Sequence, residues 1–440
     1  MYETLAILAA FVFLYSTVGG SLERTPINGA LVFTAFGLVF GPLGLDLLKL
    51  DVDAEGLRTL AELTLAMVLF TDASNSDLGV LKKNIRIPGR LLLVGLPLTI
   101  VFGFGVGVIL FGGLTLFEVA ILATMLAPTD AALGKAVVSD ERVPANMRQG
   151  LNVESGLNDG ICVPILFVFL GLAVAASGQG GGEVSPLMLV VEEIGVGAAV
   201  GIGLTLLAGW ALRQAAGRGW ISETWRQLPV PALAVACFAL AQALGGSGFI
   251  AAFVGGLLFG AIAKEHKPKY LLAAEGTGDT LSLITWVVFG AAVVGQSIDA
   301  FSWQVVLYAV LSLTVVRMLP VAISLLGSGV RPVTKLFMGW FGPRGLASLV
   351  FLLVGLEAMD AVGVSAGPLG PVVAWTVVLS VVLHGFSARP LARWYGRYAE
   401  RLPADSPEFI GDQEPRRKGV MLNAPDELQP VHPHRTHGAD

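Results

Sequence analysis

The feature that most constrains this chain is a series of long apolar runs separated by stretches with charged, Gly or Pro residues. A helix needs about 20 residues to cross the hydrocarbon core of a bilayer, and the runs are close to that length. In that core every backbone polar group needs an internal partner, so such runs fold as helices. They predict an all-α polytopic membrane protein with about thirteen transmembrane helices. The runs lie at 3–20, 28–45, 57–74, 90–112, 115–137, 148–176, 186–212, 228–244, 246–263, 276–296, 300–326, 333–356 and 367–388.

Composition supports this class and excludes others. Hydrophobic residues make up 54% of the chain and charged residues 14%, whereas a soluble domain carries about 25% charged residues. A soluble enzyme is therefore excluded, and no cofactor is expected. The net charge of −5 does not indicate a basic surface that would bind nucleic acid. The first run has no basic region before it, which indicates a spanning helix rather than a cleaved signal peptide. His384, near the end of the last run, is interpreted as a solvated side chain.

The loops predict the orientation. Odd-numbered connections between the runs carry fifteen Lys and Arg residues, whereas even-numbered ones carry two, Lys49 and Arg58. Positive residues favour the cytoplasmic side. We therefore expect a multi-pass protein of the cell (plasma or inner) membrane, with its N-terminus outside and its C-terminus in the cytoplasm. Residues 1–395 would form the transmembrane domain, and the polar stretch 396–440 a mostly disordered cytoplasmic tail.

Thirteen spans allow two six-helix halves in opposite orientations, joined by one extra helix, which is the layout of an inverted-repeat transporter. The fifth run, 115–137, contains LAPTDAALG, and the twelfth, 333–356, contains FGPRGLAS. Pro interrupts helical hydrogen bonding, and freed backbone groups persist at membrane depth where they line a wet cavity or are buried in protein. Two discontinuous helices are therefore predicted at counterpart positions, and two ordinary proline kinks are the alternative.

Several charged side chains are placed at the middle of predicted spanning helices, where each costs roughly 3 kcal/mol. If they merely paired with one another, two Arg against four acids would leave an acidic surplus. A cation site requires such a surplus. The residues are Asp72, Asp130, Glu154, Asp159, Arg317 and Arg344.

The sixth run is the richest in polar residues. Asn152, Ser155 and Asp159 share one helix face, and Glu154 and Asn158 lie on a neighbouring face. A carboxylate in a dry cavity takes up protons more readily, so a proton and Na⁺ can compete for the same oxygens.

We expect Asp159 to carry both ions, with Asp130, Ser155 and the backbone near Thr129 as further oxygen ligands for Na⁺. Asp130 can also neutralise half-helix N-ends, and Arg344 the C-ends. Glu154 needs a cation, for which Arg317 is the first choice and Arg344 the second.

The run APTDAALGKAVVSDERVPANMRQGLNVESGLNDG resembles the bacterial cation/proton antiporters of the sodium–proton exchanger type (NhaP-like, with an Asn-Asp motif). LFTDASNSDL, GSGFIAAFVGGLLFG and GPRG look like further motifs of this family, and the likeness extends over roughly residues 5–390. It implies a homodimer that works by an elevator-type motion. A mobile core domain around the third to sixth and tenth to thirteenth helices would hold two crossed, unwound helices, and the remaining helices would form a dimerisation domain.

The resemblance also implies residue roles. The family's working pair falls on Asn158 and Asp159, its Thr-Asp pair on Thr129 and Asp130, and its structural ion pair on Glu154 and Arg317. Members with Asn-Asp are generally electroneutral, so one cation per proton is expected. Some relatives carry an acidic ligand directly after the Phe of the third helix. Here Asp72 lies one place later, so it is either a ligand or a cap at the helix end.

Together these features predict a secondary transporter, not an enzyme, whose partners are Na⁺ (or Li⁺), H⁺ and the lipid bilayer. The alternative within transport is K⁺/H⁺ exchange at the same site, because selectivity depends on cavity size and ligand number. A passive cation channel is a further alternative, but a channel would not need a proton-binding carboxylate between two broken helices.

Overall fold

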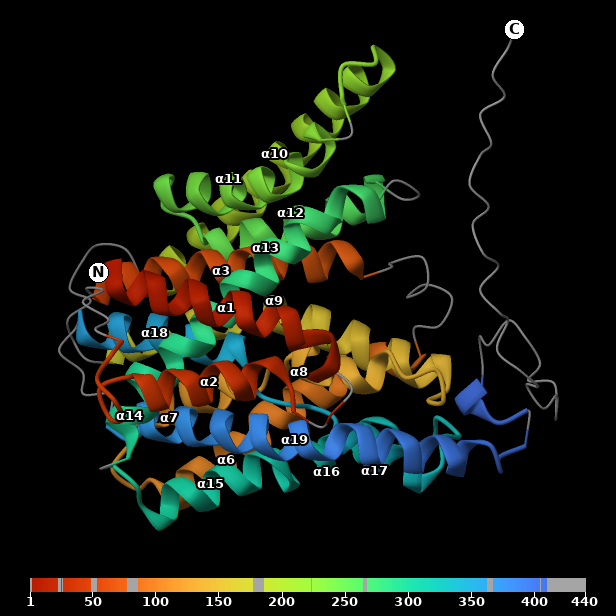
Figure 1. The fold of residues 1–440 in the computed structure, drawn as a ribbon. Coiled ribbons are helices and arrows are strands. Elements are labelled where there is room, and N and C mark those ends of the chain that lie inside the picture. The colour runs from red at the N-terminus through yellow and green to blue at the C-terminus, as the bar shows by residue number, and fades with distance from the viewer. Residues whose placement is uncertain are drawn as a thin grey trace, which may run out of the picture.

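The computed structural model describes residues 2–22, 25, 27–48, 54–76, 86–176, 186–222, 224–263, 267–298, 300–361, 367–403 and 405–409. Their regular structure is helical, and no β-strand occurs among them (Figure 1). The elements are α1 (Tyr2–Leu22), α2 (Gly29–Phe40), α3 (Ala54–Asn75), α5 (Arg86–Arg90), η1 (Leu91–Gly95), α6 (Leu96–Leu110), α7 (Leu116–Met125), α8 (Ala131–Val138), α9 (Ala145–Ala176), α10 (Pro186–Gly217), η2 (Trp225–Gln227), α11 (Pro229–Ala243), α12 (Gly248–Ala263), α13 (Lys267–Val288), η4 (Phe289–Val294), α14 (Gly295–Ser297), α15 (Trp303–Leu313), α16 (Val315–Ser324), α17 (Pro332–Trp340), α18 (Leu346–Asp360), α19 (Leu369–Ala399) and η5 (Pro407–Phe409).

Each predicted apolar run contains helix, which confirms the all-α class. Seven helical segments of the described chain are long and apolar enough to cross a membrane, and α2, α7 and α12 are shorter apolar helices. The total of thirteen spans stays a prediction. The seven long segments are Tyr2–Leu22, Arg86–Leu110, Ala145–Ala176, Val190–Gly217, Tyr270–Val294, Trp303–Ser324 and Leu369–Ala399.

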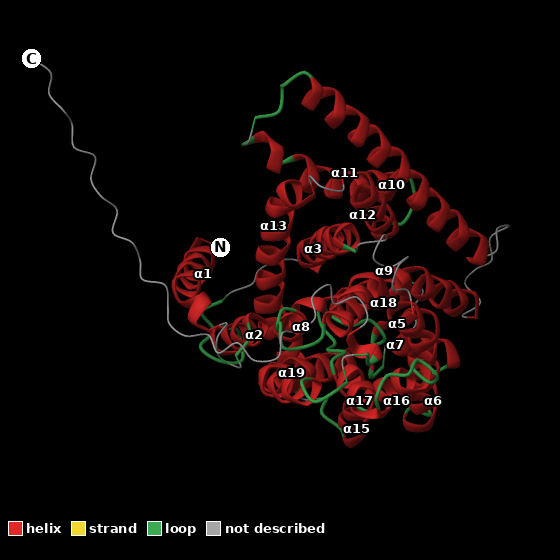
Figure 2. Cartoon of the chain, turned by 90° about the vertical axis from the view of Figure 1, so that its right-hand side faces the viewer, coloured by secondary structure: helices red, strands yellow, loops and turns green. Residues whose placement is uncertain are grey.

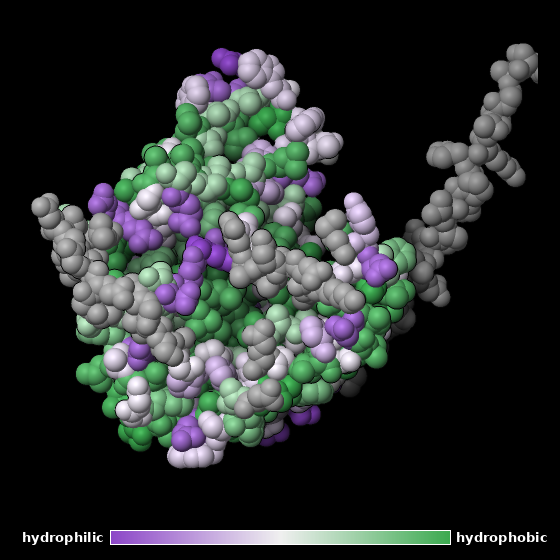
Figure 3. Space-filling model, turned by 90° about the vertical axis from the view of Figure 1, so that its left-hand side faces the viewer, coloured by the Kyte–Doolittle hydropathy of each residue, from purple (hydrophilic) through white to green (hydrophobic). Residues whose placement is uncertain are grey.

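The outer surface is suited to lipid. Large apolar side chains such as Phe13 on α1, Ile109 on α6 and Leu207 on α10 are exposed. Such a surface would favour association in water but is favourable against acyl chains. Figure 3 looks onto the end of the molecule where α1 begins and shows hydrophilic side chains gathered between apolar flanks.

Several predicted runs are interrupted rather than continuous. The fifth divides into α7 and α8, with residues 126–130 outside helix, and the twelfth into α17 and α18, with residues 341–345 outside helix. The alternative of simple proline kinks is therefore wrong. The last run is longer than predicted, because α19 continues from its apolar part through a basic stretch to Ala399.

The helices pack in two groups, which Figure 2 shows as an upper and a lower layer. Helices α3 and α10–α13 pack on one another, and α5–α9 pack with α15–α19. Gly256 and Gly260 let α12 lie directly on the α3 backbone at Phe70 and Ser74, and the Ser74 hydroxyl donates to the Gly256 carbonyl at 3.0 Å. The resemblance assigns the third and tenth helices, α3 and α13, to the core domain. In the structure they pack mainly with the group of α3 and α10–α13 rather than with α5–α9 and α15–α19.

Two remaining segments pack at the edges of these groups: α1 lies on α2, which itself packs mainly on α13 and η4, and the segment after α19 lies on α17. In α1, the Phe11 ring stacks on Phe36 of α2, with the ring centroids 3.7 Å apart. After α19, the buried Glu408 side chain accepts hydrogen bonds from the Arg331 amide at 2.9 Å and the Thr334 hydroxyl at 3.0 Å. Part of the predicted tail is therefore docked on the start of α17, and residues 410–440 lie outside the described chain.

Candidate functional site

The two helix interruptions lie against each other inside the molecule. Each contains a proline, Pro128 between α7 and α8 and Pro343 between α17 and α18. The Asp130 amide donates to the Pro343 carbonyl at 2.8 Å, which joins the two extended segments directly. Backbone groups that the broken helices leave without helical partners are thus paired between the two interruptions.

Asp130 links the N-ends of two half-helices. One carboxylate oxygen accepts from the amides of Ala132 at 2.8 Å and Leu133 at 3.1 Å at the start of α8, and the other accepts from the Leu346 amide at 3.0 Å at the start of α18. A carboxylate at this position satisfies free N–H groups and faces the positive ends of both helix dipoles. Gly345 makes room for it, because a Cβ atom there would collide with the Asp130 carboxyl group.

Arg344 provides the complementary charge at a C-end. Its Nη1 donates to the Ala127 carbonyl and, at 3.0 Å, to the Pro128 carbonyl just after α7. The side chain is fully buried, and its amide donates to the Ser380 hydroxyl at 2.6 Å. Positive charge there stabilises the negative end of the α7 dipole.

A cluster of small polar groups lies where α9 passes the first interruption. The Asn158 amide nitrogen donates to the Thr129 hydroxyl at 2.7 Å, and the Thr129 and Ser155 hydroxyls are 2.9 Å apart. Asp159 follows on the same helix and is 7% exposed. The Asn158 Oδ1 and Asp159 Oδ1 atoms are buried, and no described residue gives them a hydrogen bond. Buried oxygens normally have a partner, so each of these two atoms remains able to accept a hydrogen bond or to coordinate a cation.

Glu154 and Arg317 form a buried bidentate ion pair. Arg317 Nη1 lies 2.5 Å from Glu154 Oε1, and Nη2 lies 2.8 Å from Oε2. Each side chain is about 1% exposed. Gly342 leaves the space for the guanidinium, since a Cβ atom there would collide with Arg317. The pair joins α9 to α16 directly beside the polar cluster.

Asp72 lies within α3, three residues before its last residue, with its Cβ close to Gly156 of α9. The Ser76 hydroxyl donates to the Asp72 backbone carbonyl at 3.0 Å, so the helix end is satisfied by Ser76 rather than by the Asp72 side chain. Asp159 interacts electrostatically with both Asp130 and Asp72. The three carboxylates are therefore neighbours, but no group of three or more His, Cys, Asp or Glu side chains in the described chain could hold a metal ion by itself. A bound cation would need hydroxyl, amide or backbone oxygens as well.

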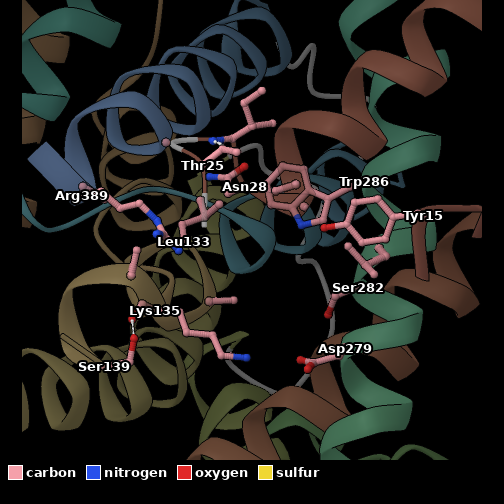
Figure 4. Close-up of a pocket in the computed structure, with 18 residues that line it drawn as sticks. Tyr15, Thr25, Asn28, Leu133, Lys135, Ser139, Asp279, Ser282, Trp286 and Arg389 are labelled. Carbon is pink, nitrogen blue, oxygen red and sulfur yellow. Dashed lines mark hydrogen bonds between the residues drawn. The ribbon is translucent and has the colours of Figure 1, made fainter. Parts of the chain in front are cut away.

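Acidic residues of α13 extend this region, although the sequence analysis did not single them out. Asp279 and Glu275 interact electrostatically with Asp72. Asp279 lines a cavity of about 310 Å³ that also borders Ala132 and Leu133, directly after Asp130 (Figure 4). Their position near the start of an apolar run could have pointed to them.

The interpretation of His384 as a solvated side chain is wrong. It is buried rather than solvated, with its ring nitrogens 2.9 Å from the Ser380 carbonyl and 2.8 Å from the Trp340 carbonyl. It thus supports the segment that holds Arg344.

Residues 7–394 match the model of a protein family described as "Sodium/hydrogen exchanger, transmembrane". An Na(+)/H(+) antiporter of Schizosaccharomyces pombe is 24% identical over 361 residues, which cover 72% of this chain and 76% of that protein. A K(+)/H(+) antiporter NhaP of Alkalimonas amylolytica is 25% identical over 378 residues, which cover 83% of this chain and 62% of that protein, somewhat less than two thirds of its length.

A solved structure has the same fold. The sodium proton antiporter MjNhaP1 from Methanocaldococcus jannaschii, at pH 8, matches with a TM-score of 0.66 and 21% identity. The match covers 87% of this chain and 99% of that one. The arrangement of helices described above is therefore one that a known membrane protein adopts.

Proposed function

Because the chain belongs to the sodium/hydrogen exchanger family, we propose that it is a secondary transporter that exchanges Na⁺ (or Li⁺) for H⁺ at Asp159. One observation carries the proposal: within the part of the chain that the structure describes, the buried oxygens Asp159 Oδ1 and Asn158 Oδ1 have no hydrogen-bond partner. An unfilled carboxylate in an enclosed site binds either a proton or a cation, and each excludes the other.

We propose a ligand set built around the contact between Thr129 and Ser155. Asp159 supplies the charge, and the hydroxyls of Thr129 and Ser155, 2.9 Å apart, supply neutral oxygens of the kind Na⁺ accepts. Asn158 holds Thr129 in place and adds its free amide oxygen. Asp130 already accepts three backbone amides, so we assign it mainly as a fixed negative charge near the ion. Asp72 would be a more distant attracting charge.

The stoichiometry we propose is one cation per proton. Asp159 is the one carboxylate of the Asn158–Asp159 pair, and Glu154 is neutralised by Arg317. A single titrating group exchanges one positive charge in each direction, so transport is electroneutral.

Access to the site would alternate by an elevator-type motion of one helix group against the other. The proposed architecture is thirteen spans in two inverted six-helix repeats, with the discontinuous fifth and twelfth helices crossing at residues 126–130 and 341–345. The packing supports α5–α9 with α15–α19 as the moving core. Helices α3 and α10–α13, together with α1 and α2, would form the static part and the homodimer contact.

For the membrane setting, we propose the cell membrane, with the N-terminus outside and the C-terminus in the cytoplasm. K⁺/H⁺ exchange is the second candidate, since one relative is named a K(+)/H(+) antiporter. A passive channel is disfavoured by the titratable site.

The test is a proteoliposome assay with an internal pH dye, to which Na⁺, Li⁺ and K⁺ are added in turn. Addition of the transported cation should move protons, without dependence on membrane potential. Asp159→Asn should abolish exchange in folded protein, because a neutral amide carries neither charge. Cation conductance without proton movement would favour a channel, and normal exchange by D159N would remove Asp159 from the mechanism.

A further inference from the structure

The cavity of about 310 Å³ beside the ion site has a divided lining (Figure 4). Lys135 of α8 and Arg389 of α19 enter it from one side, and the rings of Tyr15 of α1 and Trp286 of α13 lie on the other. Among the described lining residues, Lys135 and Arg389 are the two cations and Asp279 is the one acidic side chain, so the lining has a net positive charge. Such a lining fits an amphiphile with an anionic head.

The two cations are not neutralised within the described chain. No hydrogen bond or ion pair joins Lys135 Nζ or the Arg389 guanidinium to another described residue. A phosphate group accepts charge-assisted hydrogen bonds from both kinds of side chain. The Ser282 hydroxyl, which lines the same cavity from α13, can donate as well. The polar side of the cavity therefore has the donors that a phosphate requires.

The cavity lies at the level where phospholipid headgroups are expected. Its lining includes Thr25 of the first connection, Lys135 near the end of the fifth run, and Arg389 after the apolar part of α19. The distribution of Lys and Arg predicts all three positions on the cytoplasmic side. Basic pockets between spanning helices on that side bind anionic lipid heads.

The helix on the apolar side of the cavity also faces the surrounding lipid. Helix α1 contributes Tyr15 to the lining, and Phe13, Leu14 and Val18 near it are exposed. The acyl chains of a lipid whose head lies in the cavity therefore have an apolar surface along α1 on which to pack. A free phosphate ion would make no use of this apolar side, whereas a phospholipid uses both sides.

We propose that the cavity binds an anionic phospholipid, with its phosphate held by Lys135 and Arg389. The binding does not rest on the proposed exchange function, but its effect on exchange does. The cavity borders Ala132 and Leu133, whose amides bond to Asp130. Two unpaired cations at this place repel an approaching Na⁺, and a bound phosphate cancels their charge. The lipid would thus shield the route to the ion site.

The first experiment measures binding without transport. Purified protein, freed of lipid in a neutral detergent, is titrated with dioctanoyl phosphatidylglycerol and followed by native mass spectrometry. Lys135→Gln and Arg389→Gln should each weaken binding by about fivefold, which is the usual contribution of one Lys or Arg near an anionic lipid. Arg393→Gln is the matched control and should bind like the wild type, because Arg393 is exposed on the same helix and does not line the cavity.

Three results of this titration would overturn the proposal. The first is unchanged binding by the double variant K135Q/R389Q, or an equal loss in R393Q. The second is equal affinity for dioctanoyl phosphatidylcholine, whose head has no net charge. The third is full displacement of the lipid by inorganic phosphate, which would indicate a site for a soluble anion. Since neither cation bonds to a described residue, the variants should unfold at the wild-type temperature.

The second experiment locates the lipid in the wild-type protein, so it does not depend on the folding of any variant. Phosphatidylglycerol with a photoreactive diazirine in one acyl chain should label peptides of α1 or α13 around Tyr15 and Trp286. Unlabelled phosphatidylglycerol should compete. Labelling confined to other helices would place the lipid elsewhere and contradict the proposal.

The third experiment tests the shielding in proteoliposomes of phosphatidylcholine alone. There the wild type should need at least about twofold more Na⁺ for half-maximal exchange than K135Q/R389Q, because its two cations stay unshielded. Addition of one-quarter phosphatidylglycerol should remove most of this difference. Equal Na⁺ requirements without the anionic lipid would overturn the shielding. Absence of exchange in wild-type protein that still binds the lipid would instead reject the proposed function.

Discussion

Replacing Glu154 by Ala should destabilise the protein by about 3–5 kcal/mol, because it leaves the Arg317 guanidinium buried without its partner. The pair is bidentate at 2.5 and 2.8 Å, and both side chains are about 1% exposed. Glu154 is the partner of both Nη atoms of Arg317, and no described residue accepts from Nε, so the variant leaves the guanidinium without these bonds. At about 1.4 kcal/mol per factor of ten, the folded-to-unfolded ratio should fall roughly 10²- to 10⁴-fold.

The assay is thermal unfolding of detergent-purified variants arranged as a double-mutant cycle. Glu154→Ala and Arg317→Ala should each lower the thermal midpoint strongly, whereas the double variant E154L/R317M should recover most of it, since well-packed apolar residues replace such pairs at little cost. Arg142→Ala is the matched control. Its partner is Asp140, and the Arg142 side chain is 50% exposed, so about 1 kcal/mol or less should be lost. A wild-type midpoint for E154A would refute the bracing role of the pair.

Three further predictions test the ion site. Asn158→Asp should make exchange respond to an imposed membrane potential, because a second carboxylate lets net charge move. If the rate of this variant stayed independent of the potential, the proposed electroneutral mechanism with a single carboxylate would be contradicted. The dissociation constant for Na⁺, measured by calorimetry on purified protein, should rise by about tenfold per pH unit on the acidic side, as expected for one proton competing with one ion; a pH-independent constant would exclude competition. Gly345→Ala should lower exchange and stability together, because its Cβ would displace the Asp130 carboxylate from the half-helix ends, and a fully active G345A would show that this cap is dispensable.

Much of the fold could be predicted from the sequence, because a helix that crosses a lipid bilayer must be long and apolar. Apolar length located the helices, and a proline with a nearby glycine and one charge inside an apolar run located both interruptions. Glu154 and Arg317 could be matched because an unpaired charge is costly in the membrane, which leaves few possible partners. Hydropathy carries no such information on how helices group. The packing of α3 on α12 depends on Gly256 and Gly260 meeting the α3 backbone, a contact between segments far apart in the chain.

The fine structure of the site was less predictable, because it depends on backbone atoms rather than side-chain type. Asp130 was expected both as a ligand and as a neutralising charge, and the sequence could not show that three backbone amides already bond to its oxygens. His384 looked like a polar residue at a helix end, yet α19 runs on past it to Ala399 and buries it. In both cases the deciding partner is a main-chain group, which every residue possesses.

The interruptions and the orphaned oxygens of Asn158 and Asp159 depend on one another. If residues 126–130 formed a continuous helix, their backbone groups would bond within that helix. The Thr129 hydroxyl would then not be directed toward the Asn158 amide nitrogen, which lies 2.7 Å away. Conversely, the broken segments keep their geometry because Asp130 and Arg344 compensate the free helix ends. These two charged side chains already have partners at the helix ends. With Glu154 neutralised by Arg317, Asp159 keeps a buried oxygen that no described residue bonds. The charges that hold the broken helices in place thus leave Asp159 free for the ion-carrying role that we propose.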